Sequence, residues 1–132
     1  MMMKRYTVWL PLFIVLVGST LIPGCGPGVP EWRRDVAPAT GPEITPQGVQ
    51  FSIYAPRAKR VNIAGDFNNW SKTADPLYDR EGSGLWTIKI PLPPGRYEYK
   101  FVIDGEKWIP DPGNPEEVDD SFGGLNSVLV VK

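Results

Sequence analysis

The sequence predicts an all-β fold, an immunoglobulin-like two-sheet β-sandwich, in the part of the chain that follows residue 45. Apolar residues there recur with a period of two, no segment carries the apolar stripe of an amphipathic helix, and turn-forming residues separate the short runs. Short strands with one apolar face each favour two packed sheets over a closed barrel. Residues 46–132 are therefore expected to form one domain, whose core relies on aromatic and aliphatic side chains.

Alternation between apolar and polar residues marks the individual strands. The expected strands are residues 47–53, 61–64, 86–90, 96–103 and 127–131. Pro94-Gly95 predicts a type II turn between the third and fourth of these strands, because proline presets the first dihedral and glycine tolerates the second. Asp104-Gly105 predicts a two-residue hairpin after the fourth strand.

Residues 1–24 have the pattern of an export signal. Lys4 and Arg5 precede an apolar run, residues 6–17, that is shorter than the roughly 20 residues of a membrane-spanning helix. The segment Leu21-Ile22-Pro23-Gly24-Cys25 resembles the lipobox of bacterial lipoproteins, which implies that Cys25 is lipidated and becomes the first residue of the mature protein. The alternative is an ordinary secretory signal followed by a chance cysteine.

The proline- and glycine-rich residues 25–45 are expected to be a flexible linker between the anchor and the domain. We thus expect an exported protein of the cell envelope, attached to a bacterial membrane through Cys25. Gly26 is not the aspartate associated with inner-membrane retention in some bacteria, which favours the outer membrane.

Composition excludes several classes of function. The chain has 14 basic and 15 acidic residues, and removal of the signal takes away Lys4 and Arg5, so a nucleic-acid partner is not expected. With no histidine and one cysteine, zinc sites of the usual kind and histidine-based acid–base catalysis are excluded. No cofactor is expected.

Strand parity separates core aromatics from surface aromatics. Trp86, Tyr97, Tyr99 and Phe101 share the phase of aliphatic neighbours and are predicted to lie in the core, and Phe67 is predicted to close it. Two other tryptophans, Trp70 and Trp108, fit no such run and are the candidates for exposed rings. Strand parity alone leaves Trp70 undecided between a core ring and a bare ring, and its association with the outward-facing Lys100 and with residues 122–126 favours a bare ring. Lys100 lies in the opposite phase to Tyr99 and Phe101, so its side chain is expected to point away from the core.

Exposed indoles with amide and ammonium groups nearby could form a sugar platform, because sugar C–H faces stack on aromatic rings while hydroxyls need hydrogen-bond partners. Trp70 and Trp108 would supply the rings. Lys100, Asn68 and Asn126 would supply the hydrogen bonds. The residues alone leave two alternatives open: the tryptophans close the ends of the sandwich and Lys100 is solvated, or the exposed rings mark a protein interface.

Two groups of carboxylates could carry chemistry. The acidic residues 116–120 lack the alternating ligand spacing of a calcium loop and are expected to form a solvated acidic loop. Asp66 and Asp104 could in principle hydrolyse a glycosidic bond, but a chain of this size shows no cleft-forming insertion. No enzymatic activity is expected.

Three ordered motifs, VNIAGDFNNW, PPGRYEYKFVIDGEKWIPDP and FGGLNSVLVV, resemble carbohydrate-binding module family 48. This family includes the glycogen-binding domain of AMP-activated kinase β subunits and the N-terminal early-set domain of isoamylases and branching enzymes. The resemblance covers residues 46–132. It implies contacts to α-1,4-glucan from Trp70, Lys100, Trp108 and Asn126, and a bulky apolar residue, Phe122 or Leu125, that inserts into the glucan helix.

This sequence departs from the kinase-type pattern in three places. Gly124 stands where a hydroxyl residue is usual, Phe122 is larger than the usual leucine, and one additional residue separates the Asp104-Gly105 turn from Trp108. A one-residue shift turns a strand side chain to the opposite face unless a bulge absorbs it. The expected function is non-catalytic binding of glycogen, starch or maltodextrin by a membrane-anchored module. The alternative is an envelope module that contacts a protein partner and binds no sugar.

Overall fold

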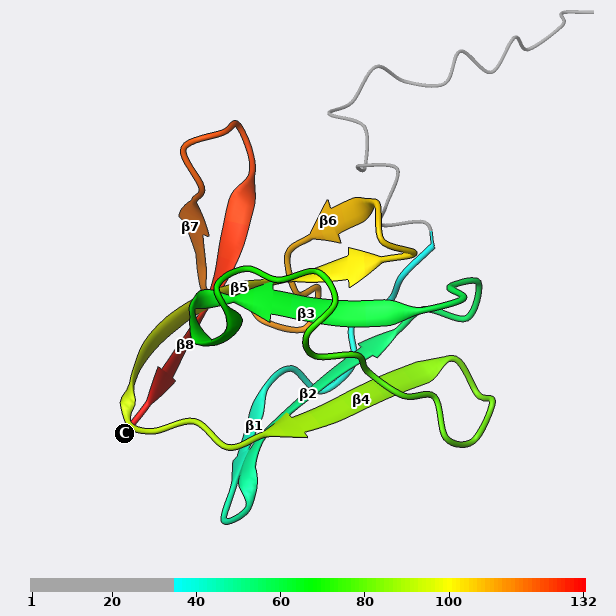
Figure 1. The fold of residues 1–132 in the computed structure, drawn as a ribbon, viewed down its shortest axis with the longest axis horizontal. Coiled ribbons are helices and arrows are strands. Elements are labelled where there is room, and N and C mark those ends of the chain that lie inside the picture. The colour runs from blue at the N-terminus through cyan, green and yellow to red at the C-terminus, as the bar shows by residue number, and fades with distance from the viewer. Residues whose placement is uncertain (1–34) are drawn as a thin grey trace, which may run out of the picture.

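Residues 35–132 are described by the computed structural model, and within them the chain forms two antiparallel β-sheets and one short 3-10 helix (Figure 1). The prediction of an all-β, two-sheet sandwich is confirmed. The expected export signal, Cys25 and the first part of the expected linker lie outside the described residues.

The smaller sheet has the strand order β1 (Glu43–Thr45), β2 (Gly48–Tyr54), β4 (Leu85–Ile90). The larger sheet has the order β3 (Val61–Gly65), β5 (Gly95–Ile103), β8 (Leu125–Val131), β7 (Glu117–Asp119), and β6 (Lys107–Ile109) also pairs with β5. The 3-10 helix η2 (Asp66–Asn68) follows β3. These bounds match the five expected strands and add three strands of three residues each, β1, β6 and β7.

The core lies between the two sheets and is rich in aromatic rings. Phe51 of β2 and Tyr99 of β5 make an edge contact, with ring centroids 4.9 Å apart and the ring planes inclined by 66°. Phe67 of η2 stacks on Phe51 at 5.9 Å and packs against the buried cluster, as predicted. Since aromatic rings bury large areas and pack with specific geometry, they supply much of what holds two small sheets together.

Ordered pairing begins before residue 46, the expected boundary between linker and domain. Ala37 forms a bridge with Tyr54, and β1 pairs with β2 from Glu43 onward. The prolines of this stretch are compatible with pairing because Pro42 and Pro46 flank β1 and none lies within it, so no ladder N–H is lost.

The expected type II turn at Pro94-Gly95 is wrong. The backbone of Gly95 does not adopt a positive φ, and this residue is the first of β5. Strands β4 and β5 belong to different sheets, so residues 91–94 cross from one sheet to the other instead of closing a hairpin. Three prolines in that segment keep it extended over the crossing.

Strand β5 changes partners along one of its edges. Residues 95–99 pair with β8 on that edge, and residues 101–103 pair with β6. The opposite edge pairs with β3 over residues 99–103. Lys100 therefore lies where β8 gives way to β6, and the two strands leave β5 in different directions (Figure 1).

The Asp104-Gly105 turn is present, but it carries an additional residue. Both turn residues have positive φ, 52° and 75°, and the Glu106 N–H donates to the Ile103 carbonyl at 3.1 Å. Strand pairing resumes one residue later, at Ile103 opposite Lys107. The additional residue is thus absorbed in the turn, and Trp108 lies opposite Val102, on the same face as Lys100.

Candidate functional site

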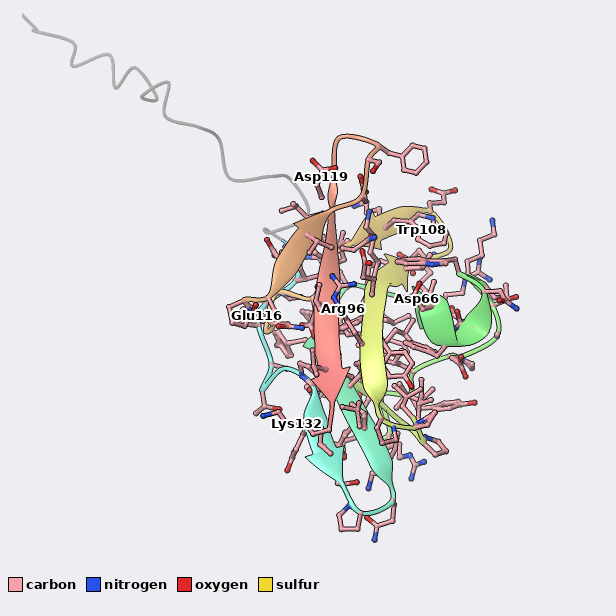
Figure 2. The ribbon with its side chains drawn as sticks, turned by 90° about the vertical axis from the view of Figure 1, so that its left-hand side faces the viewer. Asp66, Arg96, Trp108, Glu116, Asp119 and Lys132 are labelled. Carbon is pink, nitrogen blue, oxygen red and sulfur yellow. The ribbon has the colours of Figure 1, made fainter. Side chains whose placement is uncertain are left out.

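An open groove of about 540 Å³ lies on the outer face of the larger sheet, around the point where β5 changes partners. Figure 2 looks at β5 and β8 side by side, with Trp108 and Asp66 labelled on the two elements, β6 and η2, that flank them. The groove is lined by Asp66, Trp70, Glu98, Lys100, Trp108, Asp120, Phe122 and Asn126.

Trp70 is held tightly by the turn that follows η2. Its φ is 57°, in the left-handed region, and its backbone N–H donates to the Gly65 carbonyl at 2.9 Å. The indole Nε1 donates to Oδ1 of Asp66 at 3.2 Å. The ring is half-buried, so the expectation of a bare ring is wrong. A non-glycine residue at positive φ costs about 1 kcal/mol or more, and such strain persists where surrounding contacts impose it.

Trp108 and Phe122 are the more exposed rings of the groove. Trp108 is 40% exposed although it stands opposite the buried Val102, and its side chain lines the groove. Phe122 is 93% exposed, in the loop that joins β7 to β8. Together with Trp70, these side chains bring aromatic surface to the groove from three segments that are distant in sequence.

Lys100 points to the outer face, as predicted, and is bound there by a carboxylate. Its Nζ lies 2.5 Å from Oδ2 of Asp120, and the two side chains are only 13% and 10% exposed. Asp120 is therefore not part of a solvated acidic loop. Oδ1 of Asp120 also accepts the backbone N–H groups of Phe122 and Gly124, at 2.8 and 2.9 Å. The hydrogen bond from Lys100, followed by these two N–H groups, lowers the pKa of Asp120 to about 2.

Asn126 lies beside Glu98 on the outer face. Its Nδ2 donates to Oε1 of Glu98 at 3.2 Å, and Arg96 donates to Oε2 at 2.9 Å. The hydrogen bond from Arg96, followed by that from Asn126, lowers the pKa of Glu98. The Glu98 backbone N–H donates to Oδ2 of Asp66 at 2.8 Å, which ties β5 to η2.

The sequence offers Asp66 only as a catalytic acid and Asp120 only as part of a solvated loop, so no carboxylate was predicted to line the groove. Glu98 stands two residues before Lys100 in the same strand, so parity could have found it. Asp66 and Asp120 gave no such signal, because each lies in a loop or turn whose position depends on contacts to other segments.

Asn68, expected to hydrogen-bond a sugar, does not line the groove. Its Nδ2 donates to the Ile63 carbonyl and to Oδ2 of Asp75, both at 2.8 Å, and its Oδ1 accepts the Gly65 N–H at 3.0 Å. The amide therefore organises the turn that carries Trp70.

Of the two candidates for the bulky apolar residue, only Phe122 reaches the groove. Leu125 pairs with Asp119 and shares the phase of the buried Ser127, two residues along β8. Asn126, between them, points to the outer face, so Leu125 lies on the other face of the sheet.

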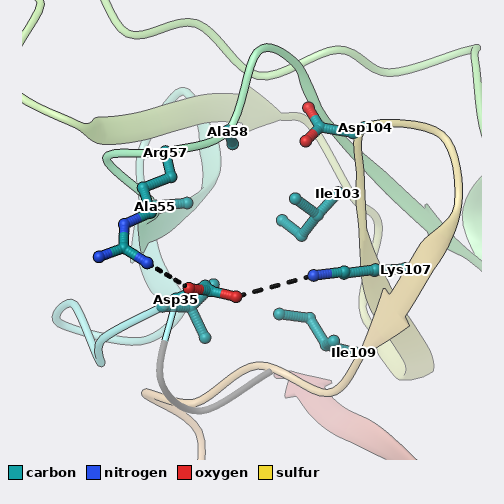
Figure 3. Close-up of a pocket in the computed structure, with 9 residues that line it drawn as sticks. Asp35, Ala55, Arg57, Ala58, Ile103, Asp104, Lys107 and Ile109 are labelled. Atoms are coloured by element: carbon teal, nitrogen blue, oxygen red, sulfur yellow. Dashed lines mark hydrogen bonds and ion pairs between the residues drawn. The ribbon is translucent and has the colours of Figure 1, made fainter. Parts of the chain in front are cut away.

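A second pocket, of about 290 Å³, lies where the first described residues meet the domain (Figure 3). Asp35 forms ion pairs there with Arg57 at 3.1 Å and with Lys107 at 3.7 Å, beside the apolar side chains of Ile103 and Ile109. The two ion pairs of Asp35 fasten residues 35–36 to the domain.

Asp66 and Asp104, weighed above as a catalytic pair, line different pockets. Oδ1 of Asp104 accepts the backbone N–H groups of Lys59 and Arg60, at 2.8 and 3.1 Å. Among residues 35–132, no cluster of acidic, histidine or cysteine side chains has the composition of a metal site. That same range contains no helix that is long and apolar enough to span a membrane.

The chain is similar in sequence to a known protein family and to several characterised proteins. The family model of carbohydrate-binding module 48 (isoamylase N-terminal domain) matches residues 39–120. A 1,4-alpha-glucan branching enzyme GlgB of Pseudomonas putida is 39% identical over 81 residues, which are 58% of this chain and 11% of that protein. A GlgB 1 of Rhizobium johnstonii is 43% identical over 63 residues, or 48% of this chain and 9% of that protein. The chain thus spans about a tenth of the length of these curated relatives.

Proposed function

Because the chain belongs to the carbohydrate-binding module 48 family, we propose that it binds α-1,4-glucan, such as glycogen, starch or maltodextrin, without a catalytic role. The observation that carries this proposal is the convergence of Trp70, Trp108 and Phe122 with Lys100 and Asn126 in one open groove. Rings stack on the apolar faces of glucose units, and the polar groups between them bind the hydroxyl edges.

The groove suits a polymer better than a single sugar. It is open along its length and its rings come from separate segments, so successive glucose units can contact different rings. An open site of this kind gives modest affinity for one short chain, and several copies on one polymer raise the overall affinity through multivalency.

The proposal is tested by titrating the full chain with maltoheptaose while tryptophan fluorescence is followed. The detergent must not carry a sugar headgroup, because an alkyl maltoside would itself compete. We expect saturable binding that Trp70→Ala and Trp108→Ala each weaken about tenfold, since central aromatic contacts commonly contribute more than 1 kcal/mol. Tyr78→Ala is the matched control, because Tyr78 is exposed and lies beside β4 of the other sheet. Unchanged fluorescence up to millimolar sugar would refute the proposal.

A second candidate function is contact with a protein partner in the cell envelope. The 93% exposure of the Phe122 ring at a loop tip favours it, because exposed aromatic rings are enriched in interfaces. If the maltoheptaose titration is flat, cross-linking through a photoreactive residue at position 122 in cells distinguishes this function. A protein that is cross-linked from position 122 but not from position 78 would support this function.

We further propose that the chain is exported and anchored to a bacterial membrane, preferentially the outer one, through lipidated Cys25. The segment 21–25 and the positive, apolar residues before it support this proposal. A fatty-acid label should enter the wild-type chain and not a Cys25→Ser variant, and the variant should appear in the soluble fraction. Equal labelling of the two would exclude the anchor. With two or more acyl chains the attachment is stable, since each buried methylene contributes about 0.8 kcal/mol.

A further inference from the structure

Acidic side chains dominate the charge of the groove. Its lining residues include three carboxylates, Asp66, Glu98 and Asp120, and one ammonium, that of Lys100. A groove that bound an anionic polymer through charge would show the opposite balance.

Among residues 35–132, the two cations found at or beside the groove are already paired. Lys100 lies 2.5 Å from Asp120, and Arg96, which neighbours the lining, lies 2.9 Å from Glu98. The lowered pKa values of Asp120 and Glu98 show that these carboxylates stay ionised near neutral pH. A phosphate or carboxylate on a ligand would have to displace one of these carboxylates to gain a cation.

Asp66 adds a negative charge that no cation of the described residues balances within ion-pair distance. Its carboxylate accepts hydrogen bonds from two neutral donors instead, the indole of Trp70 and the backbone N–H of Glu98. It lies directly beside one of the stacking rings. Any anionic group on the glucose unit over Trp70 would therefore face an ionised carboxylate.

From this charge arrangement we propose that the groove selects uncharged glucan and discriminates against glucan that carries phosphate esters or carboxylates. This inference deepens the proposed function and rests on it. Carboxylate oxygens accept hydrogen bonds from sugar hydroxyls, whereas an ionised phosphate ester brings acceptors and negative charge but few donors. Discrimination thus comes from repulsion by the ligand-binding residues themselves.

The test compares maltoheptaose with maltoheptaose that carries 6-phosphate groups, each titrated against the full chain. We expect the phosphorylated sugar to bind at least about tenfold more weakly at low salt. The ratio of the two dissociation constants should fall as salt rises from about 10 mM to about 1 M, because the screening length shrinks from about 30 Å to about 3 Å.

Two variants with the same change in net charge locate the effect. Asp66→Asn should reduce the ratio several-fold, because it removes the carboxylate that no cation balances. Glu81→Gln, in the exposed segment before β4, should leave the ratio unchanged. Equal or tighter binding of the phosphorylated sugar at low salt overturns the inference while the proposed function stands. If neither sugar binds, the proposed function fails, and the inference fails with it.

Discussion

Nζ of Lys100 lies 2.5 Å from Oδ2 of Asp120, and this pair joins the centre of β5 to the loop between β7 and β8. The same carboxylate accepts the N–H groups of Phe122 and Gly124. One aspartate therefore fixes both the cation of the groove and the loop that carries its most exposed ring. In the proposed glucan site, the lysine would therefore act chiefly by shaping the groove, and its remaining N–H groups would be the ones to meet sugar hydroxyls.

Acid should weaken this arrangement in a defined pH range. The pKa of Asp120 falls from its ordinary 3.8 to about 2 in the folded chain, so the stabilisation is complete above about pH 4 and is lost as pH falls through about 2. Thermal unfolding between those pH values should show a decline in stability that is shallower in Asp120→Asn. The pKa of Glu98 is also lowered. If Asp120→Asn keeps the full dependence of stability on pH and Glu98→Gln loses it, Glu98 and not Asp120 causes the decline.

Because Gly124 has no side chain, the ion pair between Lys100 and Asp120 has room beside it. A methyl group at this position would lie 2.7 Å from Oδ2 of Asp120 and 3.5 Å from Nζ of Lys100. Gly124→Ala should displace the carboxylate, speed amide hydrogen exchange at Phe122 and weaken maltoheptaose binding. In the matched control, Gly95→Ala, the added carbon meets only ordinary contacts of 3.5 Å or more. Unchanged exchange at Phe122 in Gly124→Ala would contradict this role.

A buried polar network supports the sheet beneath the groove. The Tyr99 hydroxyl donates to Oδ2 of Asp111 at 2.7 Å and accepts from Asn114 at 3.1 Å, and burial raises the pKa of Asp111. Tyr99→Phe leaves both partners without their hydrogen bond, so the free energy of unfolding should fall by about 1–3 kcal/mol. Urea denaturation measures this change. Tyr78→Phe, on an exposed ring, should change it by less than about 0.5 kcal/mol.

Asn68 and Asn126 should separate stability from binding. Asn68→Ala removes the partners of the Gly65 N–H and the Ile63 carbonyl, so the free energy of unfolding should fall by about 1–3 kcal/mol. Asn126→Ala should leave stability nearly unchanged and weaken maltoheptaose binding several-fold. Urea denaturation and the fluorescence titration, made on both variants, check the two effects. If Asn68→Ala is as stable as the wild type but no longer binds maltoheptaose, Asn68 acts in binding and not in organising the turn.

Strands with a buried face were predictable because every second side chain of such a strand points into the core and is apolar. β2, β3, β4, β5 and β8 each extend over at least five residues, long enough for alternation to be read. The three-residue strands β1, β6 and β7 carry too few positions for a period. The core position of Phe67 was inferred differently: once Trp70 was assigned to the surface, Phe67 was the aromatic ring of the same stretch that remained to close the core, and it packs there.

The sequence by itself determined the fold class and which face of β5 is buried. It also determined the three motifs whose residues meet in the groove. Only the tertiary structure decided that Trp108 lies on the same face as Lys100. The reason is that Glu106 belongs to the turn and not to β6, which places Trp108 opposite Val102. It also decided that Lys100 is neutralised by Asp120 and that the amide of Asn68 is occupied within its own turn. Strand parity is a local property of the chain, whereas an ion pair between residues 20 positions apart depends on how loops are placed by the packing of both sheets.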